Sequence, residues 1–228
     1  MNATPLRRDS RPQASYAAAL PSTALMGGVA ALPSMQIVGS SEFRLFLQEH
    51  HHRVGELSRI IALATGFSVD HADAIARAGA LHDIGKLFVP EAILQQPGPL
   101  NAAEQMPVRQ HSFWGYVALR RSDDPVIQLA ATVALQHHES VDGSGYPFGL
   151  AGDDIAIEAR IVSVCDVYDA LRAQRPYKPG FTHEEAFHKI LHGDDRIRPS
   201  MFDPHVLRHF QQVQTACADT FDRLRTTA

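Results

Sequence analysis

Two short clusters of histidine and aspartate are the part of this chain best suited to chemistry. His82 and Asp83 are adjacent, and His137 and His138 are adjacent further along the chain. Neutral imidazoles can each hold a metal ion, and a carboxylate can bridge two ions, as a two-metal hydrolytic site requires. One such dipeptide would mean little. Two of them, each placed where a helix is expected to end, predict a metal centre.

Helical spacing brings further metal-binding side chains to inward-facing positions. In the run of three histidines, only His50 continues the apolar stripe of its helix, so His51 and His52 are predicted to face elsewhere. Asp166 shares a face with small apolar residues, and spacing alone places His111 inward. Five imidazoles and two carboxylates suit two first-row ions such as iron or manganese, with zinc also compatible. The predicted ligands are His50, His82, Asp83, His111, His137, His138 and Asp166.

Asp83 is the expected bridge between the two ions. Its neighbour His82 can bind one ion while its second oxygen reaches the other, and a hydroxide held between the ions would be the nucleophile. For any single buried histidine the alternative is an ordinary core hydrogen bond, and that alternative weighs most at His111. Two roles remain open for Glu139 and Asp142. They could orient ligand imidazoles, or they could serve as loop and cap residues.

The elements that must position these side chains are predicted to be helices. Apolar spacing, cap residues and stop residues indicate helices at about 41–66, 70–83, 155–173 and 204–224. Stretches rich in proline and glycine predict loops at 97–99, 143–152 and 176–180. No alternation of period two extends over a useful length. The expected fold class is all-α, a single bundle of about seven helices.

Composition restricts the classes of function. A net charge of −4 and a pI of about 6.3 argue against a broad basic surface that would bind DNA. Two cysteines, Cys165 and Cys217, do not indicate a disulfide framework. A reducing compartment is therefore expected, and the cytoplasm is the expected location. Residues 1–41 are predicted to be a flexible tail rich in Ala, Pro and Ser, with a signal peptide as the alternative. The longest apolar piece, about 23–32, is too short to span a membrane.

Taken together, these residues resemble the HD-GYP domain, a branch of the HD superfamily of metal-dependent phosphohydrolases. The resemblance covers about residues 42–212, so 42–228 is expected to form one HD-GYP catalytic domain with an HD-type helical bundle. The matching segments are His50-x-x-Arg53-Val54, His82-Asp83-Ile84-Gly85-Lys86, His111 with Gly115, His137 to Pro147, Asp166 to Leu171, Arg175 to Lys178, and Phe202-Asp203-Pro204.

The resemblance implies a phosphodiesterase that hydrolyses cyclic di-GMP to pGpG, with GMP as the product of a further cut. It implies catalytic roles for Asp83 and for Lys86, a lysine near the scissile phosphate. The loop that contains Tyr146 is associated in the family with function and with contacts to GGDEF cyclases, which makes a GGDEF protein a candidate partner. Without the family, the residues alone favour a solvated charge at a helix end for Lys86 over a catalytic role. Substrate contacts are expected at Lys86, Gly145, Tyr146, Asp169, Arg175 and Lys178.

One departure from the family pattern concerns the number of metals. Some family members bind a third ion through a glutamate one helical turn before the first ligand histidine, and this chain has Phe46 there. We therefore expect two divalent ions, which puts the second cut, from pGpG to GMP, in question.

Competing functions differ in substrate or in class. A phosphodiesterase for cyclic GMP-AMP is a near alternative, and a nucleotidase of the wider superfamily is a more distant one. The rival from another class is a non-catalytic cyclic dinucleotide receptor, or an adaptor that docks a GGDEF cyclase. Degenerate domains of that kind usually lose ligands, whereas this chain keeps all those expected of a two-metal site, which favours catalysis.

Overall fold

The computed structural model describes residues 41–94, 96, 98, 101–174 and 179–225, with residues 41–47 described by their backbone alone. The chain divides into two units, Met1–Met35 and Gln36–Ala228, and every described residue belongs to the second. The predicted tail, residues 1–41, therefore lies outside the described residues except for its last position.

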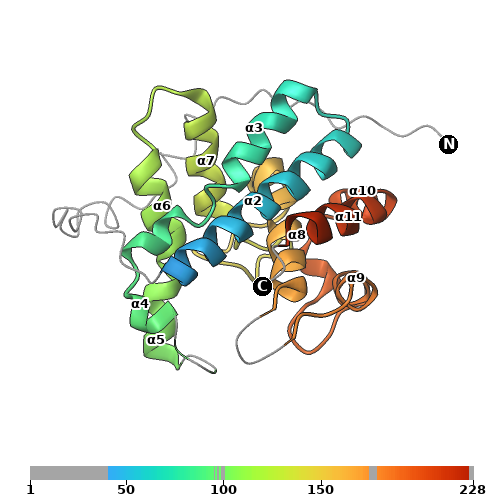
Figure 1. Ribbon diagram of the computed structural model, residues 1–228. Helices are drawn as coiled ribbons and strands as arrows, with labels where there is room; N and C mark the ends of the chain where they lie inside the picture. The colour runs from blue at the N-terminus through green and yellow to red at the C-terminus, as the bar shows by residue number, and fades with distance from the viewer. Residues whose placement is uncertain (1–40, 95, 97, 99–100, 175–178, 226–228) are drawn as a thin grey trace. The chain divides into compact units, whose positions relative to one another are not determined.

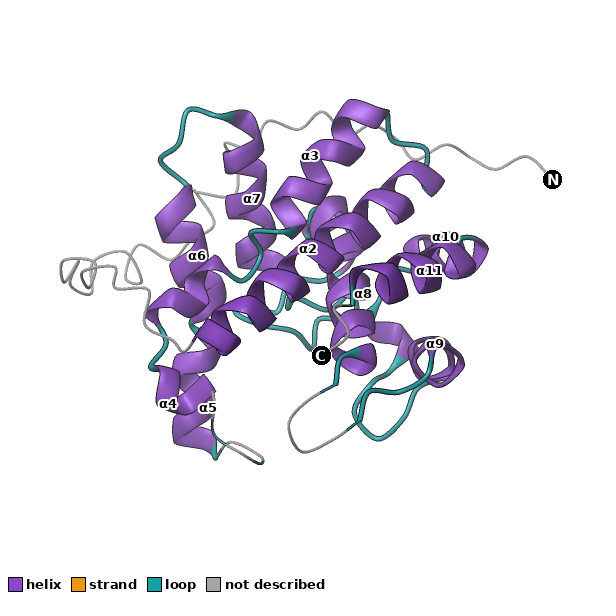
Figure 2. Ribbon diagram, in the orientation of Figure 1, coloured by secondary structure: helices purple, strands orange, loops and turns teal. Residues whose placement is uncertain are grey.

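The described residues confirm the all-α prediction, since they contain no strand and only one isolated bridge, between Asp142 and Ala151 (Figure 2). The longer helices are α2 (Ser41–Ala64), α3 (Val69–Gly79), α6 (His111–Leu119), α7 (Pro125–Gln136), α8 (Ile157–Arg172), α9 (His183–His192), α10 (Pro204–Gln212) and α11 (Gln214–Leu224). The shorter pieces are α4 (Glu91–Leu94), α5 (Ala102–Arg109) and the 3-10 turns η2 (Ile84–Phe88), η3 (Gly152–Asp154) and η4 (Pro199–Met201).

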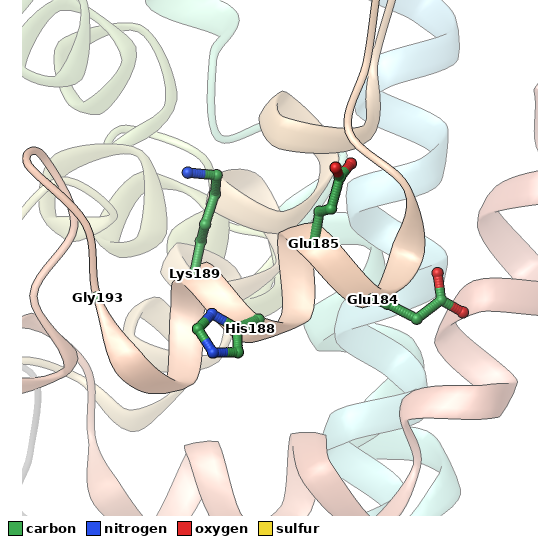
Figure 3. Close-up of a pocket in the computed structure, with 5 residues that line it drawn as sticks. All are labelled: Glu184, Glu185, His188, Lys189 and Gly193. Carbon is green, nitrogen blue, oxygen red and sulfur yellow. The ribbon is translucent and has the colours of Figure 1, made fainter.

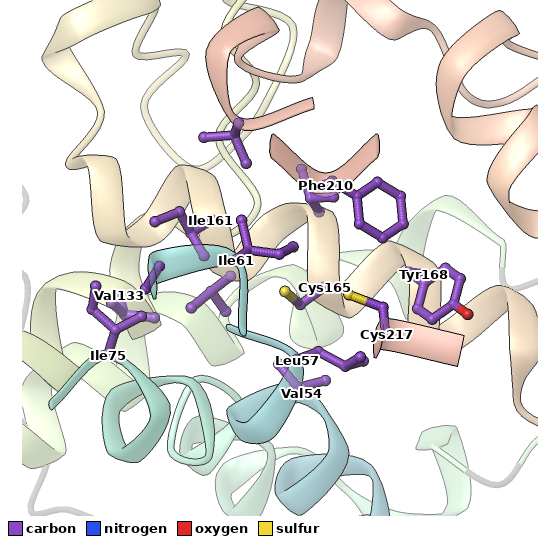
Figure 4. Close-up of a cluster of buried hydrophobic side chains, with 14 of the residues drawn as sticks. Val54, Leu57, Ile61, Ile75, Val133, Ile161, Cys165, Tyr168, Phe210 and Cys217 are labelled. Atoms are coloured by element: carbon purple, nitrogen blue, oxygen red, sulfur yellow. The ribbon is translucent and has the colours of Figure 1, made fainter. Parts of the chain in front are cut away.

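Helix α2 is the central element of the bundle. It packs against α3, α8, α10 and α11, while α7 packs against α3, α6 and α8 (Figure 1). Val54, Leu57 and Ile61, which belong to the predicted apolar stripe of α2, are almost fully inaccessible to water. These three side chains lie in one core with residues of α3, α7, α8 and α10 (Figure 4). The same helix therefore supplies both the core and the backbone that carries His50.

Cap residues explain where several helices begin. Ser68 accepts a hydrogen bond from the backbone N–H of His71 at the start of α3, and Asp124 does the same for Val126 at the start of α7. Proline at the first position of α7 and α10 needs no backbone donor there. Asn101 and Glu104 form a capping box that begins α5, a helix that the sequence analysis did not predict.

The structure corrects two predicted helices. The helix expected at 204–224 is divided at Val213, so that Phe210 before the break and Phe221 after it are both buried. The helix expected at 70–83 ends at Gly79, and the chain then turns into η2. This turn, rather than a helix, carries the His82-Asp83 pair.

Gly85 explains why η2 can lie so close to α6. A Cβ atom at Gly85 would be 1.8 Å from the carbonyl oxygen of His111 and 2.5 Å from the amide nitrogen of Gly115. Only glycine allows two backbones to approach to this extent. This contact brings the turn that carries Asp83 against the first residue of α6.

Both cysteines, Cys165 and Cys217, are buried free thiols, in agreement with the absence of a disulfide framework. Among the helices that the structure describes, none combines the length and apolar character needed to cross a membrane.

Candidate metal centre

The structure brings the seven predicted ligands together from separate elements. His50 lies on α2, Asp166 lies on α8, and His111 is the first residue of α6. The His82-Asp83 pair lies in the turn before η2, and the His137-His138 pair follows α7 directly. Their ligand atoms form three overlapping groups, in each of which all atoms lie within 4.8 Å of one another. The groups are Asp83 with His111, His137 and His138; His50 with His82 and Asp83; and His82 with His137 and Asp166.

Asp83 lies between the two ends of this cluster. Its Oδ1 atom is 3.1 Å from Nε2 of His111 and 3.7 Å from Nε2 of His137. Its Oδ2 atom is 3.3 Å from Nε2 of His82 and 3.6 Å from Nε2 of His50. Each carboxylate oxygen thus faces a different pair of imidazoles, which is the arrangement a bridging ligand needs.

Asp166 belongs to the same end of the cluster as His50 and His82. Its Oδ1 atom is 3.4 Å from Nε2 of His50 and 3.6 Å from Nε2 of His82. The side chain of Asp166 is 17% exposed, whereas that of Asp83 is buried. Asp166 therefore lies where the centre opens to water.

Backbone hydrogen bonds fix which nitrogen of three of the rings faces the centre. Three imidazoles donate their Nδ1–H to a backbone carbonyl, an arrangement that leaves the Nε2 lone pair free for a metal. These bonds run from His82 to Gly79, from His111 to Val108 and from His137 to Ala134, at 2.6, 2.5 and 3.0 Å. The tautomer follows from these partners.

The resulting geometry fits a metal ion and not a simple hydrogen-bonded core. Nε2 of His111 and Nε2 of His137 are 3.2 Å apart, so two lone pairs would face each other. Oδ1 of Asp83 and Nε2 of His82 are buried, and neither has a hydrogen-bond partner among the described residues. Buried polar atoms rarely go unsatisfied, and a bound cation would satisfy all of these atoms together.

The electrostatics of the cluster agree with this assignment. Burial lowers the pKa of His137 to about 4 and lowers the pKa of His138 well below its usual value, which keeps both rings in the neutral form that binds metals. Burial also lowers the pKa of His82, but the carboxylates of Asp83 and Asp166 outweigh it and raise this pKa to about 10. The positive charge that these carboxylates favour is one that a metal ion would supply.

Asp169 has a different place from the one predicted for it. Instead of facing a substrate, its buried carboxylate accepts hydrogen bonds from Nδ1 of His50 at 2.7 Å and from Nε of Arg53 at 2.5 Å. Nη2 of Arg53 donates a further bond at 3.1 Å. With both oxygens engaged and no exposed surface, Asp169 orients a ligand imidazole rather than contacting a substrate.

The loop that follows the adjacent histidines folds back over them. The ring of Tyr146 stacks on the ring of His138 at a centroid distance of 4.7 Å and an interplanar angle of 25°. Gly145 permits this return, because a Cβ atom there would lie 2.3 Å from the amide nitrogen of Ser140. Gly145 thus contacts the protein's own backbone. Its predicted contact with a substrate stays a prediction.

Glu139 and Asp142, whose roles the sequence left open, both hold this loop. Glu139 accepts backbone hydrogen bonds from Phe148 at 2.7 Å and from Leu150 at 3.0 Å. Asp142 accepts hydrogen bonds from the backbone and hydroxyl of Ser144, at 3.0 and 2.5 Å. Neither carboxylate has a hydrogen bond to a ligand imidazole among the described contacts, so the loop role is the one observed.

His51 is a residue near the centre that the sequence analysis placed elsewhere. Its ring centroid is 5.6 Å from that of His82, and burial lowers its pKa to about 3. Its Nε2 atom is buried and has no hydrogen-bond partner among the described residues. Helical spacing could not show this, because a long side chain just off the inward stripe can still reach the buried face. His52, by contrast, is exposed as predicted.

Among the other predicted substrate contacts, Lys86 lies at the centre. Nζ of Lys86 forms a close ion pair with Oδ2 of Asp83 across η2. Its side chain remains 26% exposed, so it can be reached from solvent. Arg175 and Lys178 lie outside the described residues.

A separate surface hollow on α9 is not part of this centre. It is lined by Glu184, Glu185, His188, Lys189 and Gly193 (Figure 3). Lys189 is paired with Asp194 at 2.9 Å, and Glu185 caps its own helix through the N–H of Thr182. These side chains already have structural partners, so the hollow gives no sign of a reactive site.

Comparisons with known proteins agree with this geometry. The HD domain family matches residues 27–206, a match that begins inside the predicted tail. The cyclic di-GMP phosphodiesterase of Thermotoga maritima is 40% identical over 184 residues, which cover 80% of this chain and 49% of the relative. The 3'3'-cGAMP-specific phosphodiesterase 2 of Vibrio cholerae is 41% identical over 142 residues, which cover 62% of this chain and 27% of the relative. The chain thus spans half or less of the length of these relatives.

A solved structure of an HDG"Y"P protein from Bdellovibrio bacteriovorus has the same fold, with a TM-score of 0.60 and 20% sequence identity. The match covers 74% of this chain and 52% of that one. The chain belongs to the HD domain family.

Proposed function

We propose that this chain is a metal-dependent phosphodiesterase that hydrolyses cyclic di-GMP to pGpG at a centre of two iron or manganese ions. The observation that carries the proposal is the convergence of all seven ligands around the shared carboxylate of Asp83. Relatives named as cyclic di-GMP phosphodiesterases, at 40% identity in Thermotoga maritima, support the choice of substrate.

The ligand residues divide naturally between two ions. His50, His82 and Asp166 would hold one ion, and His111, His137 and His138 would hold the other, with Asp83 shared between them. When bound, the ions supply activation of the attacking water and neutralisation of charge on the phosphoryl oxygens.

The chain's own residues supply orientation and charge around this centre. Asp169 and Arg53 hold the ring of His50 in place, and backbone carbonyls do the same for three other rings. Lys86 adds a positive charge beside Asp83, where it can contact a phosphoryl oxygen or the departing 3′-oxygen. Lys86, His138 and Asp166 are the partly exposed members of the centre, so we place the approach of the substrate on their side.

The first test is anaerobic incubation of the protein, loaded with iron or manganese, with cyclic di-GMP. Products are separated by chromatography, and metals are counted per chain by mass spectrometry. Two metals per chain with pGpG accumulating are the expected result. GMP as the main product would show that Phe46 does not prevent the second cut.

Asp83→Ala is the decisive variant for the two-metal mechanism. Loss of the shared carboxylate should abolish tight metal loading and turnover together, while circular dichroism shows that the helices remain. Full activity in this variant would disprove the proposed mechanism.

Cyclic GMP-AMP is the second candidate substrate, because a relative at 41% identity in Vibrio cholerae is named for it. Equal amounts of both dinucleotides in one reaction give the ratio of the two kcat/KM values directly. Binding of either dinucleotide by the metal-loaded protein without turnover would favour the receptor or adaptor hypothesis. Docking of a GGDEF protein stays a prediction for that case.

A further inference from the structure

Arg109 is a cation at the edge of the metal centre that the sequence analysis did not single out. It closes α5, two residues before the ligand His111, and its side chain is exposed. The guanidinium carbon lies 5.0 Å from the centroid of the Tyr146 ring. A cation over an aromatic face is attracted by the ring, which gives the flexible arginine a preferred position.

Tyr146 connects Arg109 with the metal ligands. Its ring stacks on the ring of His138, as described above, at 4.7 Å. Burial raises the pKa of the Tyr146 hydroxyl, and the carboxylates of Asp83 and Asp166 raise it further. Arg109 therefore stands one ring away from the centre, on its outer side.

Arg109 differs from the other cations near the centre in having no acidic partner. Arg53 is buried and bound to Asp169, and Lys86 is paired with Asp83. The backbone carbonyl of Arg109 accepts a hydrogen bond from Ser112, but its guanidinium has a ring contact and no hydrogen bond or ion pair among the residues that the structure describes. Its five N–H donors are thus available to a ligand.

We propose that Arg109 is a substrate-binding residue that binds the phosphate of the cyclic dinucleotide that is not being cut. This inference rests on the proposed function. A cyclic dinucleotide has two phosphates, and the metals and Lys86 would neutralise the one that lies at the centre. The second phosphate needs a positive charge at the rim, and a guanidinium fork matches phosphate oxygens in a bidentate way. Tyr146 holds that fork beside the centre.

The test compares two substrates in three manganese-loaded variants. Cyclic di-GMP has two phosphodiesters, whereas bis(p-nitrophenyl) phosphate has one and cannot use a second phosphate site. For Arg109→Ala we expect KM for cyclic di-GMP to rise about tenfold or more, with little change in kcat, as expected for loss of a charged hydrogen bond. Arg109→Lys should recover part of this loss, because it keeps the charge without the fork.

Arg120→Ala is the matched control. Arg120 is also exposed and also lies over a tyrosine ring, that of Tyr116 at 5.9 Å. It differs in position, because it follows the C-terminal end of α6, whereas His111 is the first residue of that helix. It should behave as the wild type with both substrates. Metal content, measured for each variant, should be unchanged.

The outcomes separate the two proposals. If the wild type cleaves neither substrate, the proposed phosphodiesterase activity fails. If the wild type cleaves both and Arg109→Ala has an unchanged KM for cyclic di-GMP, the inference about Arg109 is overturned and the proposed function stands. If Arg109→Ala loses activity equally on both substrates, the inference about Arg109 is also overturned. The same holds if Arg120→Ala loses as much activity on cyclic di-GMP as Arg109→Ala does. An equal loss on both substrates would indicate that Arg109 acts in packing of the loop. An equal loss in Arg120→Ala would indicate a general effect of surface charge.

Discussion

Asp83 and Asp169 are both buried aspartates in contact with histidine, yet they serve different purposes. Both oxygens of Asp169 are satisfied by hydrogen bonds from protein groups, whereas Oδ1 of Asp83 has no hydrogen-bond partner among the described residues. A satisfied carboxylate orients its neighbours, and an unsatisfied one is available to a metal. Contact partners distinguish them here, since the residue type is the same.

Asp169→Asn should destabilise the metal-free protein by about 3–5 kcal/mol, because it leaves the buried guanidinium of Arg53 without its countercharge. Urea unfolding followed by circular dichroism measures this change. The variant should also bind manganese about 10–100-fold more weakly, since the ring of His50 loses its support.

Asp73→Asn is the control for this experiment. Asp73 pairs with Arg59 at the same distance of 2.5 Å as Asp169 with Arg53, but on the exposed surface. Exposed ion pairs contribute little, so the free energy of unfolding and the manganese affinity should both stay nearly unchanged. Similar losses in the two variants would contradict the role given to Asp169.

At the scale of elements, the close approach of η2 to α6 places Asp83 beside His111. Gly85→Ala should force these two backbones apart, because its Cβ atom would meet the carbonyl oxygen of His111 at 1.8 Å. We expect a loss of about 1–3 kcal/mol in the free energy of unfolding, typical of overpacking, together with weaker metal binding. Gly66→Ala, at a φ of 93° but with open space around it, should cost about 1 kcal/mol through backbone strain. Normal manganese affinity in Gly85→Ala would show that the contact does not position Asp83.

The pair of His71 on α3 and Glu158 on α8 predicts a pH dependence of stability. The two side chains are 2.9 Å apart, and the hydrogen bond to Glu158 raises the pKa of His71 above its usual 6.5 despite partial burial, which lowers it. Because the folded-state pKa is raised, the stabilisation is complete below pH 6.5 and is lost as the pH rises through the raised pKa. The pair is partly exposed, so we expect at most about 1 kcal/mol.

Urea unfolding of the metal-free protein between pH 5.5 and 8.5, roughly one unit or more on either side of the usual histidine pKa, tests this prediction. The difference in unfolding free energy between the wild type and His71→Gln should shrink as the pH rises. A difference that is constant across the range would show that the ion pair does not contribute.

At the scale of the whole molecule, the candidate metal centre joins α2, α6, α7 and α8. Without a cation, some of its side chains face one another with lone pairs, and others have no hydrogen-bond partner in the described part of the chain. Manganese should therefore stabilise the fold, by about 2.7 kcal/mol when its free concentration is one hundred times the dissociation constant. Thermal unfolding with EDTA and after re-addition of manganese measures this effect. Asp83→Ala should show no shift, and an equal shift in that variant would place the stabilising metal elsewhere.

Local patterns in the chain predict the types of side chain at the centre, their helical faces and the all-α fold. Adjacent dipeptides and the spacing of apolar residues are local properties, and they suffice to identify His50, His82, Asp83 and the 137–138 pair as inward residues. The break between the last two helices and the turn at 80–83 could not be predicted from these local patterns. Helix ends depend on what each turn packs against. The extent of the tail, 1–41, stays a prediction.

Which side chains meet depends on how the helices and loops pack against one another. Sequence spacing gives the face of a helix on which a residue lies, but not the partner helix, the closure of a loop or the reach of a long side chain. For this reason Asp169 moved from a predicted substrate contact to a support of His50, and His51 came close to His82. The stack of Arg109 on Tyr146, between residues far apart in sequence, exists only because the 138–147 loop folds back onto the site.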